Sequence, residues 1–66
     1  MKLTVNGKPV ELPDGSTVAA LLLHLGVEPA KVAIERNEDV VPRRTWAEAG
    51  LDDGDHIEIV TFVGGG

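Results

Sequence analysis

The chain has 66 residues, eleven acidic and six basic side chains, a formal net charge of −5 and no cysteine. A chain of this length forms one domain with a small core, which disfavours an autonomous enzyme, and the lack of cysteine excludes disulfides, thiol nucleophiles and thiolate metal sites. The acidic balance, with one Phe, one Trp and no Tyr, argues against nucleic-acid binding and favours basic protein partners.

The N-terminal residues predict a β-hairpin. Apolar and polar residues alternate over residues 1–5, and apolar side chains return at Val10 and Leu12. Asn6-Gly7 lies between the two runs and is a strong hairpin signal, because both residues tolerate positive φ. An alternating start is unlike a signal peptide, and no apolar run approaches the roughly 18 residues of a membrane span. We therefore expect a cytoplasmic protein without a membrane partner.

An amphipathic helix is predicted after a turn at residues 13–15. Ser16 or Thr17 is a suitable N-cap residue. Apolar residues then follow at helical spacing, namely Val18, Leu21, Leu22 and Leu25. Gly26 suits the C′ position, where the backbone is left-handed, and Pro29 prevents the helix from continuing.

Three further strands are predicted. Residues 32–35 alternate and residues 37–39 form a turn, after which residues 40–41 make a short strand that Pro42 ends. Residues 45–49 predict one turn of helix, capped by Thr45 and closed by Gly50. Trp46 and Leu51 are expected to fill one end of the core. A tight acidic turn then leads into a final strand at residues 56–63.

This order of elements predicts an α+β fold. A hairpin, a helix, two short strands and a final strand imply one mixed sheet of four to five strands, with the main helix packed on one face. Pairing of the N- and C-terminal strands at the centre of that sheet is the arrangement called the β-grasp. We expect residues 1–63 to form this domain as a monomer. The expected core comprises Leu3, Val5, Leu21, Leu22, Leu25, Ile34, Ile57 and Ile59.

The tail of Gly64, Gly65 and Gly66 is the first candidate site. Glycine has no side chain to pack and is costly to order, so we expect a flexible tail that reaches away from the domain. Frayed ends and fusion remnants also leave terminal glycines. Here the glycines directly follow a strand without a polar linker, which favours a C-terminus presented to a partner and able to thread a narrow channel.

The final strand carries the second candidate site. Ile57, Ile59, Thr61 and Val63 share one face, and Glu58, Val60 and Phe62 share the other. If the first set faces the helix, Val60 and Phe62 are exposed beside the tail, and together with Val63 they form a candidate partner-binding patch. Two exposed apolar residues are also common on surfaces without any binding role.

The titratable residues give little support for catalysis, and we expect no metal or cofactor site. His24 lacks a second ligand at helical spacing and is expected on the solvent side of the helix. His56 beside Asp55 would be half of a catalytic dyad, but no nucleophile accompanies it. The acidic run of residues 52–55 lacks the spacing of a calcium loop and indicates a solvated turn or a contact for basic partner residues. Arg43 and Arg44 are either partner contacts or simply exposed.

Several segments carry a resemblance that extends over essentially the whole chain. They are Met1 to Gly7, Leu21-Leu22, Ala33-Ile34 leading to Asn37, Val41-Pro42-Arg43 followed by Trp46, Gly54-Asp55, and Phe62 to Gly66. With these segments the chain resembles the ThiS family, the ubiquitin-like sulfur carriers of thiazole synthesis in thiamine biosynthesis. The terminal Gly-Gly is shared by all ubiquitin-like carriers, whereas the Val-Pro-Arg and Trp segment and the length point to this family.

The resemblance implies a carrier whose reacting residue is Gly66. An adenylyltransferase of the ubiquitin-activating type would use ATP to adenylate the Gly66 carboxylate. Sulfur from a donor such as a cysteine desulfurase would then displace AMP and leave a thiocarboxylate. A thiazole synthase would take that sulfur for the thiazole ring. The chain would thus be a protein cosubstrate and not an enzyme.

Three alternatives remain at this point. A molybdopterin synthase small subunit would use the same thiocarboxylate but bind permanently to a large subunit, and such chains are usually longer. A ubiquitin-like protein modifier would form an isopeptide bond from Gly66 to a lysine. A binding module would use the domain alone and leave the tail idle.

Overall fold

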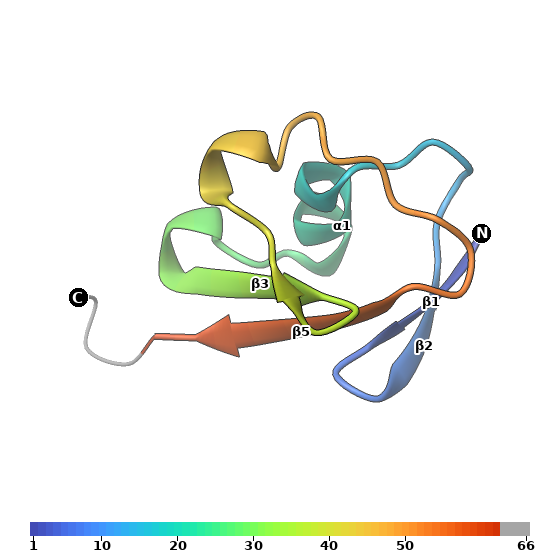
Figure 1. The fold of residues 1–66 in the computed structure, drawn as a ribbon, viewed down its shortest axis with the longest axis horizontal. Helices are drawn as coiled ribbons and strands as arrows, with labels where there is room; N and C mark the ends of the chain where they lie inside the picture. The colour runs from blue at the N-terminus through green and yellow to red at the C-terminus, as the bar shows by residue number, and fades with distance from the viewer. Residues whose placement is uncertain (63–66) are drawn as a thin grey trace.

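A computed structural model of the chain describes residues 1–62. Its elements are β1 (Lys2–Val5), β2 (Lys8–Glu11), α1 (Val18–Leu25), β3 (Val32–Arg36), β4 (Asp39–Val40) and β5 (His56–Thr61), with 3-10 helices at Pro29–Lys31 and Arg43–Thr45 (Figure 1). In this part of the chain no helix is long and apolar enough to cross a membrane. The predicted hairpin, main helix and later strands are all present.

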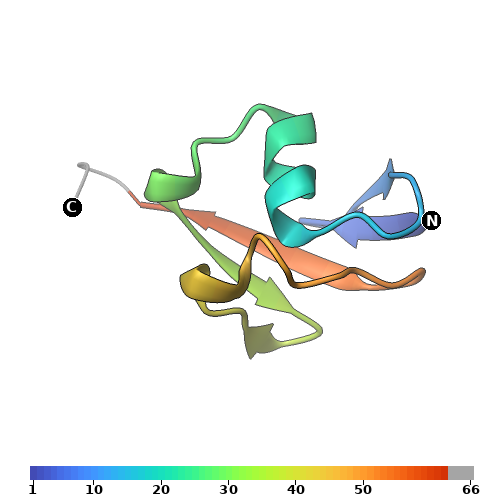
Figure 2. The same ribbon diagram turned by 90° about the horizontal axis from the view of Figure 1, so that it is seen from above.

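The five strands form one mixed sheet in the order β2-β1-β5-β3-β4. The two terminal strands β1 and β5 run parallel at its centre, with Val5 opposite Ile57, and every other pair is antiparallel. This arrangement confirms the predicted β-grasp. Figure 2 shows β5 crossing the molecule and extending well beyond the β1-β2 hairpin toward the C-terminus.

The helix packs on one face of this sheet, and both 3-10 helices lie on the same side (Figure 1). Thr17 is the N-cap residue, and its hydroxyl accepts a hydrogen bond from the N–H of Ala20 at 3.2 Å. The helix and the inner face of the sheet bury one continuous core. Its members are Leu3, Val5, Leu12, Val18, Leu21, Leu22, Val32, Ile34, Trp46, Leu51 and Ile57.

Leu25 is not a core residue, contrary to the helical spacing. The helix ends at this residue, which is 37% exposed. Gly26 follows in a left-handed conformation with φ 71°, which turns the chain back so that the Val27 N–H bonds the Leu22 carbonyl at 3.0 Å. Val27 packs against the core, whereas Leu25, the last residue of the helix, stays at the surface. Ile59, also expected in the core, is only half-buried.

The segment before the last strand differs from its prediction in one respect. Trp46 and Leu51 are buried as expected, with the indole N–H bonded to the Val41 carbonyl at 2.9 Å. The short helix, however, begins at Arg43 and ends at Thr45, whose hydroxyl donates to the Pro42 carbonyl at 2.7 Å. Because Pro42 fixes the backbone angle at the helix start, the turn forms earlier than residues 45–49 suggest.

Candidate functional site

The end of β5 defines where the chain leaves the domain. Thr61 pairs with Val32 at the start of β3, and the N–H of Phe62 donates to the Lys31 carbonyl at 2.8 Å. Hydrogen bonding to the domain therefore continues as far as Phe62. The remaining predicted site residues, Val63 and residues 64–66, lie outside the described part of the chain.

Two of the predicted partner-binding residues are exposed on the outer face of the sheet, the face that α1 does not cover. Val60 is 50% exposed and Phe62 is 47% exposed, whereas Ile57, whose side chain points to the opposite face, is 1% exposed. Ala33 lies opposite Val60 on β3. These three residues, Ala33, Val60 and Phe62, form what we call the apolar patch, which ends where the tail begins.

A pair of acidic residues lies on the same face, two residues farther from the tail along β3 and β5. Glu35 on β3 and Glu58 on β5 are directly opposed in the antiparallel register. They line a hollow of about 380 Å³ together with Asn37, Glu38 and His56, which we call the acidic hollow. Within residues 1–62, neither Glu35 nor Glu58 takes part in a salt bridge.

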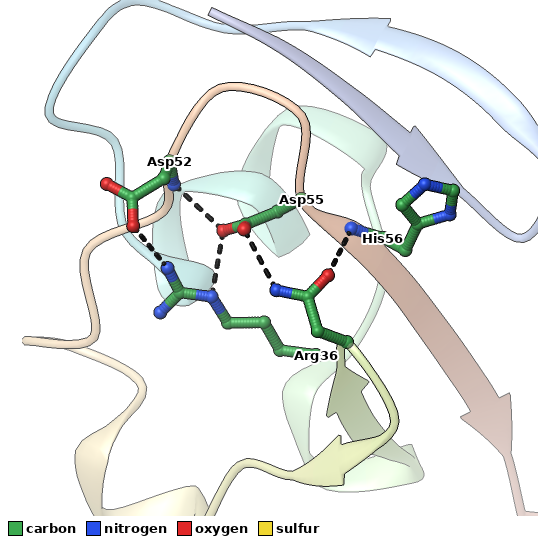
Figure 3. Close-up of polar contacts among 5 residues, drawn as sticks. Arg36, Asp52, Asp55 and His56 are labelled. Carbon is green, nitrogen blue, oxygen red and sulfur yellow. Dashed lines mark hydrogen bonds and ion pairs between the residues drawn. The ribbon is translucent and has the colours of Figure 1, made fainter.

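The acidic turn before β5 is held by a buried carboxylate and not only by solvent. Asp55 is buried, and its two oxygens accept from Arg36 Nε at 2.8 Å, from Asn37 Nδ2 at 3.0 Å and from the Asp52 N–H at 2.8 Å (Figure 3). Burial opposes ionisation, but the hydrogen bonds from Asp52 and Asn37 and the charge of Arg36 outweigh it and hold the pKa of Asp55 below its ordinary value. For Asp55, the prediction of a solvated turn or partner contact was therefore wrong.

Within residues 1–62, neither histidine side chain is paired with a carboxylate. The backbone N–H of His56 donates to Asn37 Oδ1 at 2.9 Å, and Figure 3 shows the imidazole directed away from Asp55. The candidate half-dyad is therefore not assembled. His24 is exposed on the helix, as expected. The described residues contain no group of three or more His, Asp or Glu side chains placed to hold a metal ion.

Arg43 has a structural role. Its guanidinium donates to the carbonyls of Pro29 and Val32, the latter at 2.8 Å, and lies 4.5 Å from the centre of the Trp46 ring. A larger hollow of about 540 Å³ beside it, on the helix side, is lined mainly by apolar residues and contains no carboxylate or imidazole. Arg44 is exposed.

Sequence reasoning missed the residues that depend on pairing across strands. Strand alternation identified Val60 and Phe62, because a single strand is sufficient to assign its two faces. The opposed pair of Glu35 and Glu58 requires the register between β3 and β5, which alternation alone does not give. The turn sequences around Asn37 signalled a turn, but not that its side chain would reach Asp55.

Comparison with known proteins gives consistent similarities. A model of the ThiS family matches residues 3–66. The chain is 42% identical to the sulfur carrier protein ThiS of Bacillus subtilis, over 97% of this chain and 98% of that protein. A crystal structure of the thiamine biosynthesis protein ThiS from Geobacter metallireducens superposes with a TM-score of 0.83 at 39% identity, covering 100% of both chains.

A longer relative matches as well. The chain is 48% identical to a thiazole synthase of Paramagnetospirillum magneticum over all 66 residues. It spans only 20% of the length of that relative.

Proposed function

Because this chain belongs to the ThiS family, we propose that it is a sulfur carrier whose Gly66 carboxylate becomes a thiocarboxylate and supplies sulfur for thiazole formation in thiamine biosynthesis. In this role the chain is a protein cosubstrate, and partner enzymes provide the catalytic groups. The observation that carries the proposal is the full-length likeness, in sequence and in fold, to a ThiS protein.

The tail is converted in three steps: adenylation, sulfur transfer and reduction. A carboxylate is a poor electrophile, so an adenylyltransferase first joins the Gly66 carboxylate to the α-phosphate of ATP and releases pyrophosphate. A sulfur donor, such as the persulfide of a cysteine desulfurase, then attacks the acyl carbon, and AMP leaves. The acyl disulfide formed in this way is cleaved by a second thiol, which supplies the two electrons and leaves as a disulfide with the donor cysteine. The tail then carries sulfur in place of one carboxylate oxygen, and thiazole synthase consumes it.

The domain holds the start of the tail in place, and the length of the tail sets how far the Gly66 carboxylate extends from it. Hydrogen bonding of the strand as far as Phe62 gives the tail a defined origin. From Val63 to Gly66 an extended chain spans roughly 10–14 Å, which lets the carboxylate enter an enclosed site while the domain stays outside. Glycines 64–66 add no side chains that would widen the required channel.

The partners are an adenylyltransferase of the ubiquitin-activating type, a sulfur donor and a thiazole synthase. The apolar patch and Val63 would dock against these enzymes as the tail enters them. A thiazole synthase with a region similar to this chain supports the last partner, since carrier and synthase sequences then occur in one polypeptide. All these reactions fit a cytoplasmic protein that is a monomer between encounters.

The proposal is tested by following the mass of the chain. Incubation of the 66-residue protein with an adenylyltransferase, ATP, a sulfur donor and a thiol reductant should raise its mass by the difference between one sulfur and one oxygen atom, and fragmentation should assign the change to Gly66. A reaction without ATP is the control. An unchanged mass, or sulfur on any other residue, would contradict the proposal, and a ladder of lysine conjugates would instead indicate a protein modifier.

A further inference from the structure

The two opposed carboxylates of the acidic hollow repel each other, and no salt bridge within residues 1–62 reduces this repulsion. Like charges at directly opposed positions of an antiparallel pair destabilise it, and Glu35 and Glu58 occupy such positions. The hollow has no basic residue in its lining, and the two basic side chains in and before β3 are paired with other carboxylates: Arg36 with Asp52 and Asp55, and Lys31 with Glu28 at 3.3 Å. A cation that entered the hollow would therefore remove a repulsion as well as form new contacts.

The hollow and the apolar patch form a single ordered strip on the outer face. Along β3 and β5, the opposed pair Glu35 and Glu58 is followed two residues later by the opposed pair Ala33 and Val60. Phe62 comes next, directly after the end of β5, and the tail follows it in sequence. Along the outer face, the acidic hollow therefore comes first, the apolar patch second and the C-terminal tail last.

We infer that the protein surface that receives the tail inserts a basic side chain, best an arginine, between Glu35 and Glu58. A planar guanidinium donates to two carboxylates at once and fits an opposed pair better than the point charge of lysine does. The hollow of about 380 Å³ gives such a side chain room beside the patch. Charge complementarity then fixes the direction in which the carrier lies on its partner, with the tail pointing toward the active site.

The inference rests on the proposed function for the identity of the partner, an adenylyltransferase. Its test uses Glu35→Gln, Glu58→Gln and the double variant, which keep side-chain size and remove charge. Glu48→Gln is the matched control, because it removes one charge from an exposed residue in a different segment, the turn that follows the second 3-10 helix. The dissociation constant for the adenylyltransferase is measured over a range of salt concentrations, and thermal unfolding is measured for each free variant.

Each Gln variant in the hollow should weaken binding by roughly three- to tenfold at low salt, with a shallower dependence on salt. The double variant should lose less than the product of the single losses, since both carboxylates contact one cation. The unfolding temperature of the free variants should be unchanged or higher, because a repulsion is removed. Glu48→Gln should bind like the wild type.

Two results would overturn the inference. One is affinity and salt dependence in the hollow variants equal to those of Glu48→Gln. The other is a lower unfolding temperature, which would mean that the two carboxylates are stabilised within the chain. If the wild type binds the enzyme and is thiocarboxylated while either result is found, only this inference fails. If the wild type neither binds nor is thiocarboxylated, the proposed function fails with it.

Discussion

The side-chain amide of Asn6 forms both hydrogen bonds that a neighbouring strand would form with Ile59. Its Nδ2 donates to the Ile59 carbonyl at 3.2 Å, and its Oδ1 accepts from the Ile59 N–H at 2.7 Å. The register of β1 with β5 reaches Val5 and Ile57, so Asn6 continues the pairing one step toward the tail. Asn6 does this from a left-handed backbone with φ 49°, a conformation that asparagine tolerates better than most residues.

Asn6→Gly should therefore destabilise the domain. Glycine suits the positive φ, so the change isolates the two lost hydrogen bonds and should lower the free energy of unfolding by about 1–2 kcal/mol. Chemical denaturation measures the effect, and amide exchange at Ile59 should become faster. Glu38→Gly is the control, because Glu38 also has a positive φ of 75° but its side chain takes part in no salt bridge within residues 1–62, and this variant should be neutral or stabilised. Equal stability of Asn6→Gly and the wild type would contradict this role.

Protonation of Asp55 should make the free energy of unfolding of the domain depend on pH. Because its folded pKa lies below its ordinary value near 3.9, the carboxylate stabilises the fold above that pH, and this contribution is lost as the pH falls through the folded pKa. Asp55→Asn should cost about 2 kcal/mol at neutral pH and show a smaller loss of stability on acidification below about pH 4. Denaturant unfolding at several pH values measures both.

Asp39→Asn is the control for this effect. Asp39 is exposed and makes no polar side-chain contact among the described residues, so its replacement should change the free energy of unfolding by less than about 0.5 kcal/mol. If Asp55→Asn retained the full acid dependence of the wild type, the carboxylate of Asp55 would not be its source.

The contrast between Leu21 and Leu25 shows how far helical spacing predicts the core. Both fit the same apolar stripe, but Leu21 is fully buried and Leu25 is 37% exposed. Leu21→Ala should cost about 2–5 kcal/mol, whereas Leu25→Ala should cost clearly less, since no comparable cavity forms. Thermal or chemical unfolding of the two variants compares them directly, and similar losses would mean that Leu25 packs as spacing alone suggests.

Periodicity assigned the strands and the faces of the helix because it depends only on local geometry. It could not foresee that Gly26 would return the chain to the core through Val27, since this depends on the angle at which the loop leaves the helix. The same limit applies to the site. Val60 and Phe62 follow from one strand, whereas Glu35 opposite Glu58 and Arg36 against Asp55 require tertiary register.

Phe62→Asp should weaken binding to the adenylyltransferase or thiazole synthase without unfolding the domain. Phe62 is 47% exposed at the end of the described chain, and losing an apolar anchor that is desolvated in a complex typically costs about 1–3 kcal/mol of binding free energy. Leu23→Asp is the matched control, because Leu23 is 83% exposed on the helix, which packs against the other face of the sheet. Calorimetric titration measures both, and equal affinities for the two variants would show that the apolar patch is not a docking surface.

Removing Gly66 tests whether the length of the tail matters to its chemistry. With hydrogen bonding of the strand extending to Phe62, deletion of one residue withdraws the carboxylate by about 3.5 Å, more than a reacting geometry tolerates, so adenylation should fall severely. Adding a residue beyond Gly66 should also prevent the reaction at Gly66, because its carbonyl is then part of a peptide bond. Pyrophosphate release measures adenylation.

Both variants should unfold at the wild-type temperature, because the core lies within the part of the chain that ends at Phe62. Thiocarboxylation of the shortened chain at the wild-type rate would contradict the prediction that the reaction requires the full length of the tail.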